Sequence, residues 1–197
     1  MCYISFQNSL NLPLVEKSFN NVFGANQKIT TAKTALNFGI ILGGISLVYS
    51  LMLFFLDMHY QGDTTTSVIG YLIFIIIVFW AIRDFKKNNN GYISLSEALK
   101  TGVGTSLISA IILCIYTIIL IQYLDPEFLD KSIEYQKQKL LQEDPEISIE
   151  NVNKMFDMQK EFSGPFIISG FIIIFNLFFG FIISLIVGLI LKKSQPE

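Results

Sequence analysis

The chain has 197 residues, of which 52% are hydrophobic and only 15% are charged, and its formal net charge is −2. A mean hydropathy of +0.53 is too high for an ordinary soluble domain of this length. The acidic balance, with a pI near 5.4, excludes the basic patch that nucleic acid requires, and two distant cysteines predict neither a disulfide nor a metal cage.

The first 33 residues are polar and rich in asparagine, and none of their apolar runs is long enough for a signal peptide. We expect residues 1–33 to form a flexible or loosely surface-bound tail. A start codon assigned too far upstream would produce the same pattern, so whether residues 1–30 belong to the natural protein stays open.

Two apolar runs then predict two spanning helices joined by a short loop. Residues 34–56 and 64–82 carry no charged side chain. A helix rises about 1.5 Å per residue, so about 20 residues cross a hydrocarbon core of about 30 Å. We place the spans at about 34–56 and 67–82. After Gly70 the second run contains neither glycine nor serine, so we expect it to face lipid at the edge of the bundle.

A polar stretch, 83–100, is predicted as the loop before the third span. Three asparagines followed by Gly91 are typical of a turn, and Ser94 with Glu97 has the spacing of a capping box. The third span is therefore predicted at about 98–124. The same stretch fits a calcium-binding EF-hand loop, but Lys86 would occupy the first ligand position and repel the ion, so we predict no calcium site.

Residues 125–164 hold half of the charged residues of the chain and predict an amphipathic helical hairpin. Asp125 is predicted to cap its first helix, because Pro126 follows at the position where proline is favoured. Apolar residues recur at helical spacing on both sides of Pro145, which is predicted to interrupt the hairpin. Ser163-Gly164-Pro165 then restarts the chain as a fourth span, 165–191.

Small side chains recur at four-residue spacing in three of the four spans. In lipid, where burial of apolar surface does not drive association, such stripes let helices approach closely. The helix-packing residues predicted from this spacing are Gly39, Gly43, Gly102, Ser106, Ala110, Asn176, Gly180, Ser184 and Gly188.

No motif predicts catalysis. The polar residues inside the spans are all neutral, and they are more typical of hydrogen bonds between helices than of a transport path, although a passive path stays open. The single histidine, His59, lies at a membrane edge, and neither Gly-x-Ser-x-Gly nor His-Glu-x-x-His occurs. We predict no catalytic, cofactor-binding or metal-binding residue, and hence no enzyme.

Several short motifs carry a family resemblance. They are Ala32-Lys33 leading to Gly39, Asn90 to Ser94 with Glu97 to Lys100 and Gly102, Asp125-Pro126 with Phe128, and Phe179 to Phe181 with Ile183 to Ile186 followed by Lys192-Lys193. On these residues the chain resembles domain-of-unknown-function family 4199, a bacterial integral-membrane family. The resemblance covers roughly residues 32–197 and implies a four-helix membrane protein without an assigned activity.

The basic residues predict the orientation. The first loop has no lysine or arginine, the second has four, and lysines precede the first span and follow the fourth. We therefore expect a multi-pass protein of the inner membrane with cytoplasmic N- and C-termini. Its fold is predicted as an all-α membrane domain, 34–197, with the hairpin outside the cytoplasm between the third and fourth helices.

Two functions follow from this reading. The first is a structural or regulatory subunit that lies in the lipid bilayer and binds another membrane protein, or a second copy of itself. The alternative is a small oligomeric transporter or pore for a neutral or weakly charged solute. The lack of charged residues inside the spans favours the subunit.

The predicted orientation is tested by fusing the chain to a reporter that is active only outside the cytoplasm. We expect activity for a fusion after Gln142 and none for fusions after Asn89 or Glu197. The opposite pattern would reverse the orientation.

Overall fold

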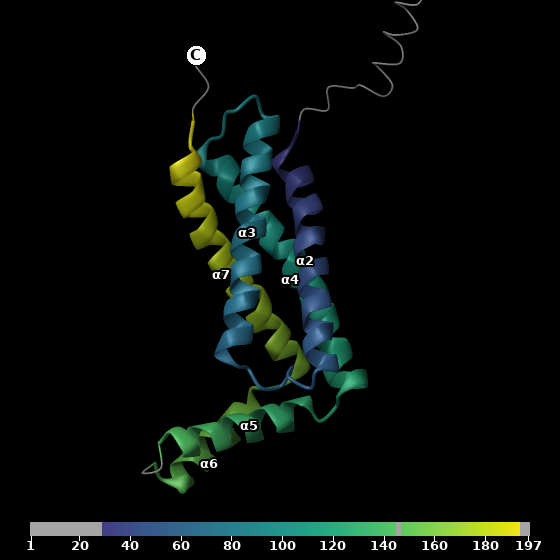
Figure 1. Cartoon of the computed structure of the whole chain (residues 1–197), viewed down its shortest axis with the longest axis vertical. Coiled ribbons are helices and arrows are strands. Elements are labelled where there is room, and N and C mark those ends of the chain that lie inside the picture. Colours follow the sequence, from purple (N-terminus) through teal and green to yellow (C-terminus); the bar gives the residue numbers. More distant parts are fainter. Residues whose placement is uncertain (1–28, 145–146, 194–197) are drawn as a thin grey trace, which may run out of the picture.

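The computed structural model describes residues 29–144 and 147–193 (Figure 1). Within them lie six α-helices and one π-helical turn, η1. They are α2 (Thr31–Phe55), α3 (Thr64–Asn88), α4 (Leu95–Ile119), η1 (Leu120–Leu124), α5 (Phe128–Glu143), α6 (Ile149–Glu161) and α7 (Pro165–Leu191). The expected flexibility of residues 1–28 and the interruption at Pro145 lie outside the described residues.

Four of these elements are long and apolar enough to cross a membrane: α2, α3, α4 continued by η1, and α7. The described chain is therefore an all-helical bundle of four candidate spans, as the sequence predicts. One end carries the 56–63 loop and the α5–α6 hairpin and is called the hairpin end; the other carries Ile29, the 89–94 loop and Lys193 and is called the terminal end (Figure 1).

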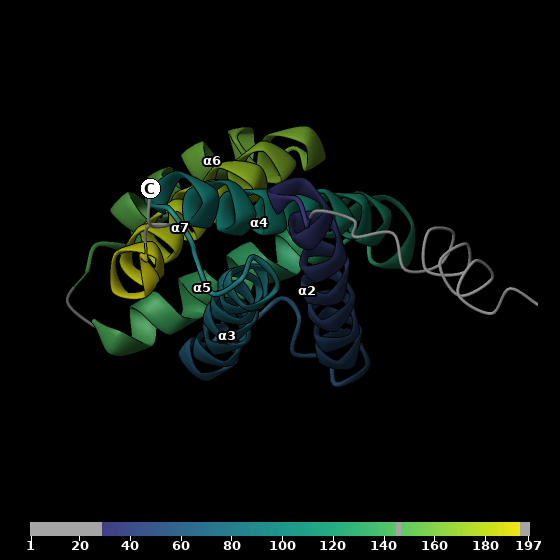
Figure 2. The same cartoon turned by 90° about the horizontal axis from the view of Figure 1, so that it is seen from above.

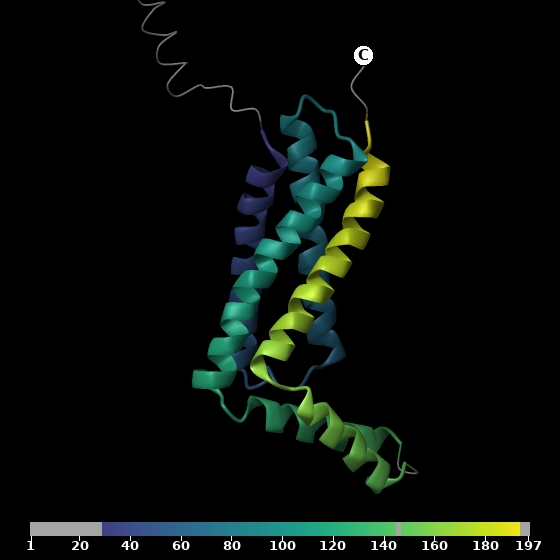
Figure 3. The ribbon, with the colours of Figure 1, turned by 180° about the vertical axis from the view of Figure 1, so that it is seen from behind.

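Helix α4 is the central element of the bundle. It packs along α2 on one side and along α7 on the other, whereas α2 and α7 share almost no contacts (Figure 3). Helix α3 covers this row of three from one face and packs less closely against each of them (Figure 2). The hairpin lies across the end of the bundle, with its long axis at a steep angle to the spans (Figure 1).

Small side chains permit the close approach of α4 to its two neighbours. A Cβ added to Gly39 of α2 would lie 2.6 Å from Ile108 Cβ of α4, and one added to Gly180 of α7 would overlap Ser106. The hydroxyl of Ser106 is buried in this contact and donates to Gly102 O, at 3.0 Å, within its own helix. Such bonds allow a hydroxyl to pack between helices without an unmet polar group.

Helix α3 joins the core only in its terminal half. Ile77, Val78, Ala81, Ile82 and Phe85 are buried, and no described residue of α3 before Ile77 is. All of these except Ala81 pack with Leu42, Ile93, Ala98 and Val187 in one hydrophobic cluster, here called the core cluster. Buried side chains thus hold α3 in its terminal half, and its hairpin half makes looser contacts such as that of the Tyr71 and Phe179 rings.

The loop between α3 and α4 is shorter than predicted. The expectation of a loop over 83–100 is wrong, because α3 continues through its charged last turn to Asn88, and only residues 89–94 are non-helical. Basic residues in the last turn are favourable to the helix dipole, and Lys86 Nζ also donates to Leu191 O at 2.8 Å. The capping box is confirmed, since Ser94 and Glu97 bond each other's backbone N–H groups.

Helix α7 begins at a proline and is tied to a neighbouring loop where it ends. Pro165 is its first residue, as predicted from Ser163-Gly164-Pro165. Beyond its last turn, Lys193 exchanges two backbone hydrogen bonds of 3.0 Å with Ile93, which forms an isolated antiparallel bridge. The terminal end of α7 is therefore tied to the loop that precedes α4.

Replacing Gly180 with leucine should force α7 away from α4. Overpacking a fitted interior costs about 1–3 kcal/mol, and we expect that loss in the free energy of unfolding, seen as earlier thermal aggregation in detergent. Gly170→Leu on the same helix is the matched control, because a Cβ there meets no atom within 4 Å. Equal losses in both variants would show that the small residues are not a packing face.

Candidate functional site

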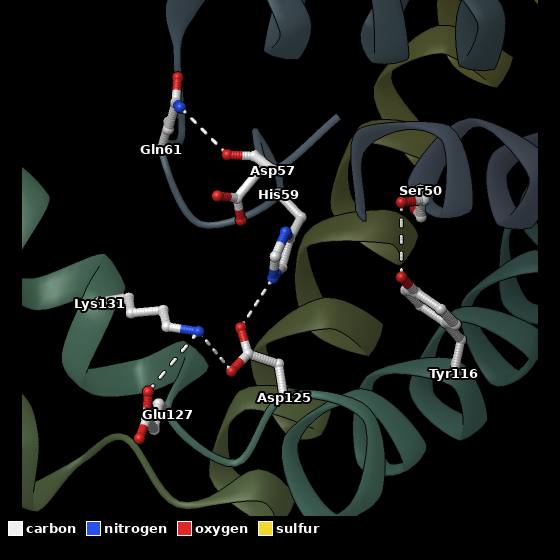
Figure 4. Close-up of polar contacts among 8 residues, drawn as sticks. All are labelled: Ser50, Asp57, His59, Gln61, Tyr116, Asp125, Glu127 and Lys131. Atoms are coloured by element: carbon white, nitrogen blue, oxygen red, sulfur yellow. Dashed lines mark hydrogen bonds and ion pairs between the residues drawn. The ribbon is translucent and has the colours of Figure 1, made fainter. Parts of the chain in front are cut away.

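A partly buried polar cluster joins the first loop to the start of the hairpin. His59 Nε2 lies 3.0 Å from Asp125 Oδ2, and Lys131 Nζ donates to Asp125 Oδ1 at 2.9 Å (Figure 4). The side chains of His59 and Asp125 are 7% and 9% exposed, and that of Lys131 is 41% exposed. These three residues are here called the junction cluster.

The charges of the junction cluster stabilise one another. Burial alone would raise the pKa of Asp125, but hydrogen bonds from Lys131 and His59 outweigh it and hold that pKa below its ordinary value. The hydrogen bond to Asp125 raises the pKa of Lys131 in turn. Asp125 is therefore an anion with both carboxylate oxygens engaged.

The predicted role of Asp125 as a helix cap is wrong. Helix α5 begins at Phe128, its N-cap is Glu127, and no side chain caps it. The Asp125 carboxylate is already bound to His59 and Lys131, which leaves it unable to reach the first turn. Its backbone N–H donates to Leu120 O at 2.8 Å, which closes the π-helical turn η1. This turn places Asp125 at the hairpin end of the bundle.

The ring of His59 sits among aromatic side chains. Its centroid lies 5.0 Å from that of Phe54, 5.4 Å from Tyr60 and 5.7 Å from Phe128, against which it is stacked. A carboxylate only accepts hydrogen bonds, so Nε2 carries the proton that Asp125 binds. Nδ1 is buried and has no partner among the described residues. These contacts fix the orientation of the ring, which connects the first loop to Asp125 and the start of α5.

Two further contacts hold α5 against the bundle. Lys139 Nζ lies 3.9 Å from Asp63 Oδ1, and the rings of Tyr60 and Tyr135 meet edge to face with centroids 6.1 Å apart. All these partners come from the 56–63 loop on one side and from α5 on the other. The first loop is therefore the segment of the bundle against which the hairpin packs.

A cavity of about 460 Å³, here called the inter-helix cavity, opens between the spans on the hairpin side. It exists because α3 packs closely only in its terminal half. Its walls are aromatic and aliphatic with a few neutral polar groups and no charged residue. The lining residues are Ser46, Tyr49, Ser50, Ser67, Gly70, Tyr71, Phe74, Leu113, Ile168, Phe171, Ile172, Phe175, Asn176 and Phe179.

The inter-helix cavity does not continue through the bundle. On its terminal side the core cluster fills the space between the same helices, and Leu42, Val78 and Ile82 in it are fully buried. A small molecule could enter from the hairpin half, but the described conformation offers it no exit to the terminal end.

The structure separates Asn176 from the other predicted packing residues. The remaining eight are buried. Their glycines meet side chains of neighbouring spans, in the pairs Gly39 with Ile108, Gly43 with Ile112, Gly102 with Ser184, Gly180 with Ser106 and Gly188 with Ala98. Asn176 is half-buried in the cavity wall, and its Nδ2 donates to Ile172 O of its own helix.

Sequence reasoning missed the junction cluster and the inter-helix cavity. His59 and Asp125 are 66 residues apart, and no spacing rule joins a loop histidine to an aspartate after another span. In the described ranges, no three His, Cys, Asp or Glu side chains gather as metal ligands would.

Comparison with known proteins identifies a family. Residues 37–193, which are most of the chain, match the family described as "Protein of unknown function (DUF4199)", and the chain belongs to it. No curated protein and no solved structure matches the chain.

Asp125→Asn should loosen the hairpin. The substitution leaves the buried polar groups around position 125 with weaker partners, which costs about 1–3 kcal/mol of folding free energy. Hydrogen exchange of the α5 amides in nanodiscs would detect this loss as reduced protection. Glu127→Gln is the matched control, because that carboxylate is 79% exposed and 3.7 Å from Lys131.

The protection of the α5 amides should also depend on pH. Because the folded pKa of Asp125 is lowered, its stabilisation is complete at neutral pH and is lost as the pH falls through that value, below the ordinary aspartate range. Protection of α5 in the native chain should then fall in acid towards that of Asp125→Asn. If α5 of Asp125→Asn lost protection in acid as steeply as α5 of the native chain does, the assignment of this pH dependence to Asp125 would be contradicted.

Proposed function

We propose that this member of the DUF4199 family is a non-enzymatic protein of the bacterial inner membrane, and that it acts as a structural or regulatory subunit. It binds another membrane protein through the α5–α6 hairpin. Both termini are cytoplasmic and the hairpin lies outside, because basic residues flank the terminal end and are absent from the first loop.

One observation carries this proposal: half of the apolar face of α6 has no partner among the described residues. Val152 and Phe156 are 1% and 6% exposed and pack towards α5, but Met155, Met158 and Phe162 are 47%, 64% and 62% exposed. Met155 and Met158 lie on one face of α6, and Phe162 follows directly after its last residue; these three exposed residues are here called the α6 stripe. An exposed apolar stripe outside the spans is typical of an interaction site.

The chemistry of the α6 stripe suits a protein partner. Methionine is flexible and polarisable, so it adapts to the shape of another surface, and phenylalanine provides a rigid anchor. The charged residues of α6, among them Glu150, Lys154 and Asp157, lie on its other face, where water solvates them. The helix thus presents an apolar surface bordered by charge.

The hairpin is held in place before it meets a partner. Lys160 Nζ of α6 donates to Asp130 Oδ1 of α5 at 2.6 Å, and the junction cluster fixes α5 to the first loop. A surface that is already ordered loses less conformational entropy on binding. These contacts support the proposal that the hairpin is a binding surface held at a fixed position relative to the spans.

The inter-helix cavity favours a second candidate function, the small oligomeric transporter or pore. Its neutral lining would suit an uncharged solute. Transport would, however, require α3 to separate from the core cluster, or a path between copies of the chain, because the core cluster closes the cavity on the terminal side.

The proposed docking is tested with a photo-crosslinking amino acid at position 158 of the full chain, expressed in bacterial membranes. We expect one discrete adduct with another membrane protein. The same label at Asp157, an exposed residue on the charged face, is the matched control and should give none.

The size of the adduct decides between outcomes. An adduct of twice the chain mass would assign the α6 stripe to self-association rather than to a different partner. Adducts with lipid alone, or equal labelling from both positions, would overturn the proposal.

A further inference from the structure

We propose that the inter-helix cavity is a binding site for a neutral amphipathic alcohol, a molecule with an apolar body and a hydroxyl group. This proposal is independent of the docking of the hairpin. It rests on polar groups in the cavity wall that have no partner, on their depth in the bundle and on the absence of charge around them.

Four polar groups of the cavity wall make no hydrogen bond among the described residues, and one of them is the hydroxyl of the half-exposed Tyr71. The other three are the hydroxyls of Ser46 and Ser50 and the carboxamide oxygen of Asn176. Ser106 and Ser184 instead donate to the carbonyl four residues earlier in their own helices, and the Ser109 hydroxyl, which also has no partner among the described residues, is buried away from the cavity. The unengaged groups therefore face the cavity rather than their helices.

These groups lie deep in the apolar layer. Ser50 and Ser46 are five and nine residues before the end of α2, and Asn176 is eleven residues into α7. At about 1.5 Å per residue, they lie about 8–16 Å from the hairpin end. Bulk water does not reach such a depth, and an unmet polar group there is costly. A bound molecule that reaches them would meet this requirement.

The free atoms define the polar part of that molecule. Asn176 Oδ1 is an acceptor, and Nδ2 of the same side chain already donates one of its two hydrogens to Ile172 O at 2.8 Å. A ligand hydroxyl can donate to Oδ1, and the serine hydroxyls can either donate to it or accept from it. A hydroxyl group serves both kinds of neighbour.

The rest of the cavity defines the body of the ligand. No lysine or arginine lines it, so it lacks the groups that bind phosphate, and a phospholipid headgroup does not fit. Six of its fourteen lining residues are aromatic, among them Phe171, Phe175 and Phe179 of α7. A volume of about 460 Å³ lies in the range of small-molecule sites, which bury apolar ligands with a few polar contacts.

The test uses an aliphatic alcohol that carries a photoactivatable diazirine, with the full chain reconstituted in phosphatidylcholine vesicles. We expect saturable labelling of cavity residues, displaced by excess unlabelled octanol. The corresponding diazirine alkane, which lacks the hydroxyl, should label without saturation, because lipid competes with it equally.

Variants separate the hydrogen bond from the cavity itself. Asn176→Leu should weaken the binding of the alcohol about two- to tenfold, the usual worth of one hydrogen bond. Ser67→Ala is the matched control and should change nothing, because the Ser67 hydroxyl lines the cavity but already donates to Asp63 O at 2.9 Å. The melting temperature of each variant, measured in the same vesicles, checks the fold.

A third variant closes the cavity without strain. At Gly70 an added Cβ would meet only Tyr49 Cε1, at 3.9 Å, so Gly70→Leu should fold normally and abolish the saturable labelling. Should Asn176→Leu fail to fold, the Ser46→Ala/Ser50→Ala pair gives the same readout. Labelling that never saturates, or that is equal in the native chain and in Asn176→Leu, would overturn the proposal and leave the cavity as a space for bulk lipid.

Discussion

The close packing of α4 against both α2 and α7 is the constraint on which the rest of the structure depends. Spanning helices gain nothing from hiding apolar surface from lipid, so they associate where small side chains let backbones approach. Helix α4 presents Gly102 and Ser106 to α7, and on its other side Ile108 of α4 packs onto Gly39 of α2. Helix α3 has no glycine or serine stripe after Gly70, so it packs closely only in its terminal half, through the core cluster and Ala81, and the inter-helix cavity forms at the other end.

The hairpin end depends on a different kind of interaction. A buried carboxylate is tolerated only when opposite charge and hydrogen bonds surround it, and removal of one partner costs far more than the pair contributes. Asp125 meets this condition through His59 and Lys131, which belong to different segments of the chain. The junction cluster therefore requires the first loop and α5 to stay together, and this places the α6 stripe at a defined position relative to the membrane.

Local patterns allowed much of the fold to be predicted, and long-range contacts explain what was missed. The four apolar runs, the capping box at Ser94 and the start of α7 at Pro165 are each set by neighbouring residues. Asp125 was assigned to a cap because its local sequence is typical of one, but a histidine 66 residues away binds it instead. The cavity depends on where α3 diverges from the bundle, which no single run of sequence encodes.

Paired cysteines test the central position of α4 most directly, in a background in which Cys2 and Cys114 are alanine. Oxidation in membranes should form a disulfide between Gly180→Cys and Ser106→Cys, and another between Gly39→Cys and Ile108→Cys. No disulfide should form between Gly39→Cys and Gly180→Cys, since α2 and α7 share almost no contacts. Rapid formation of that last disulfide within one chain, with failure of the other two, would contradict the central position of α4.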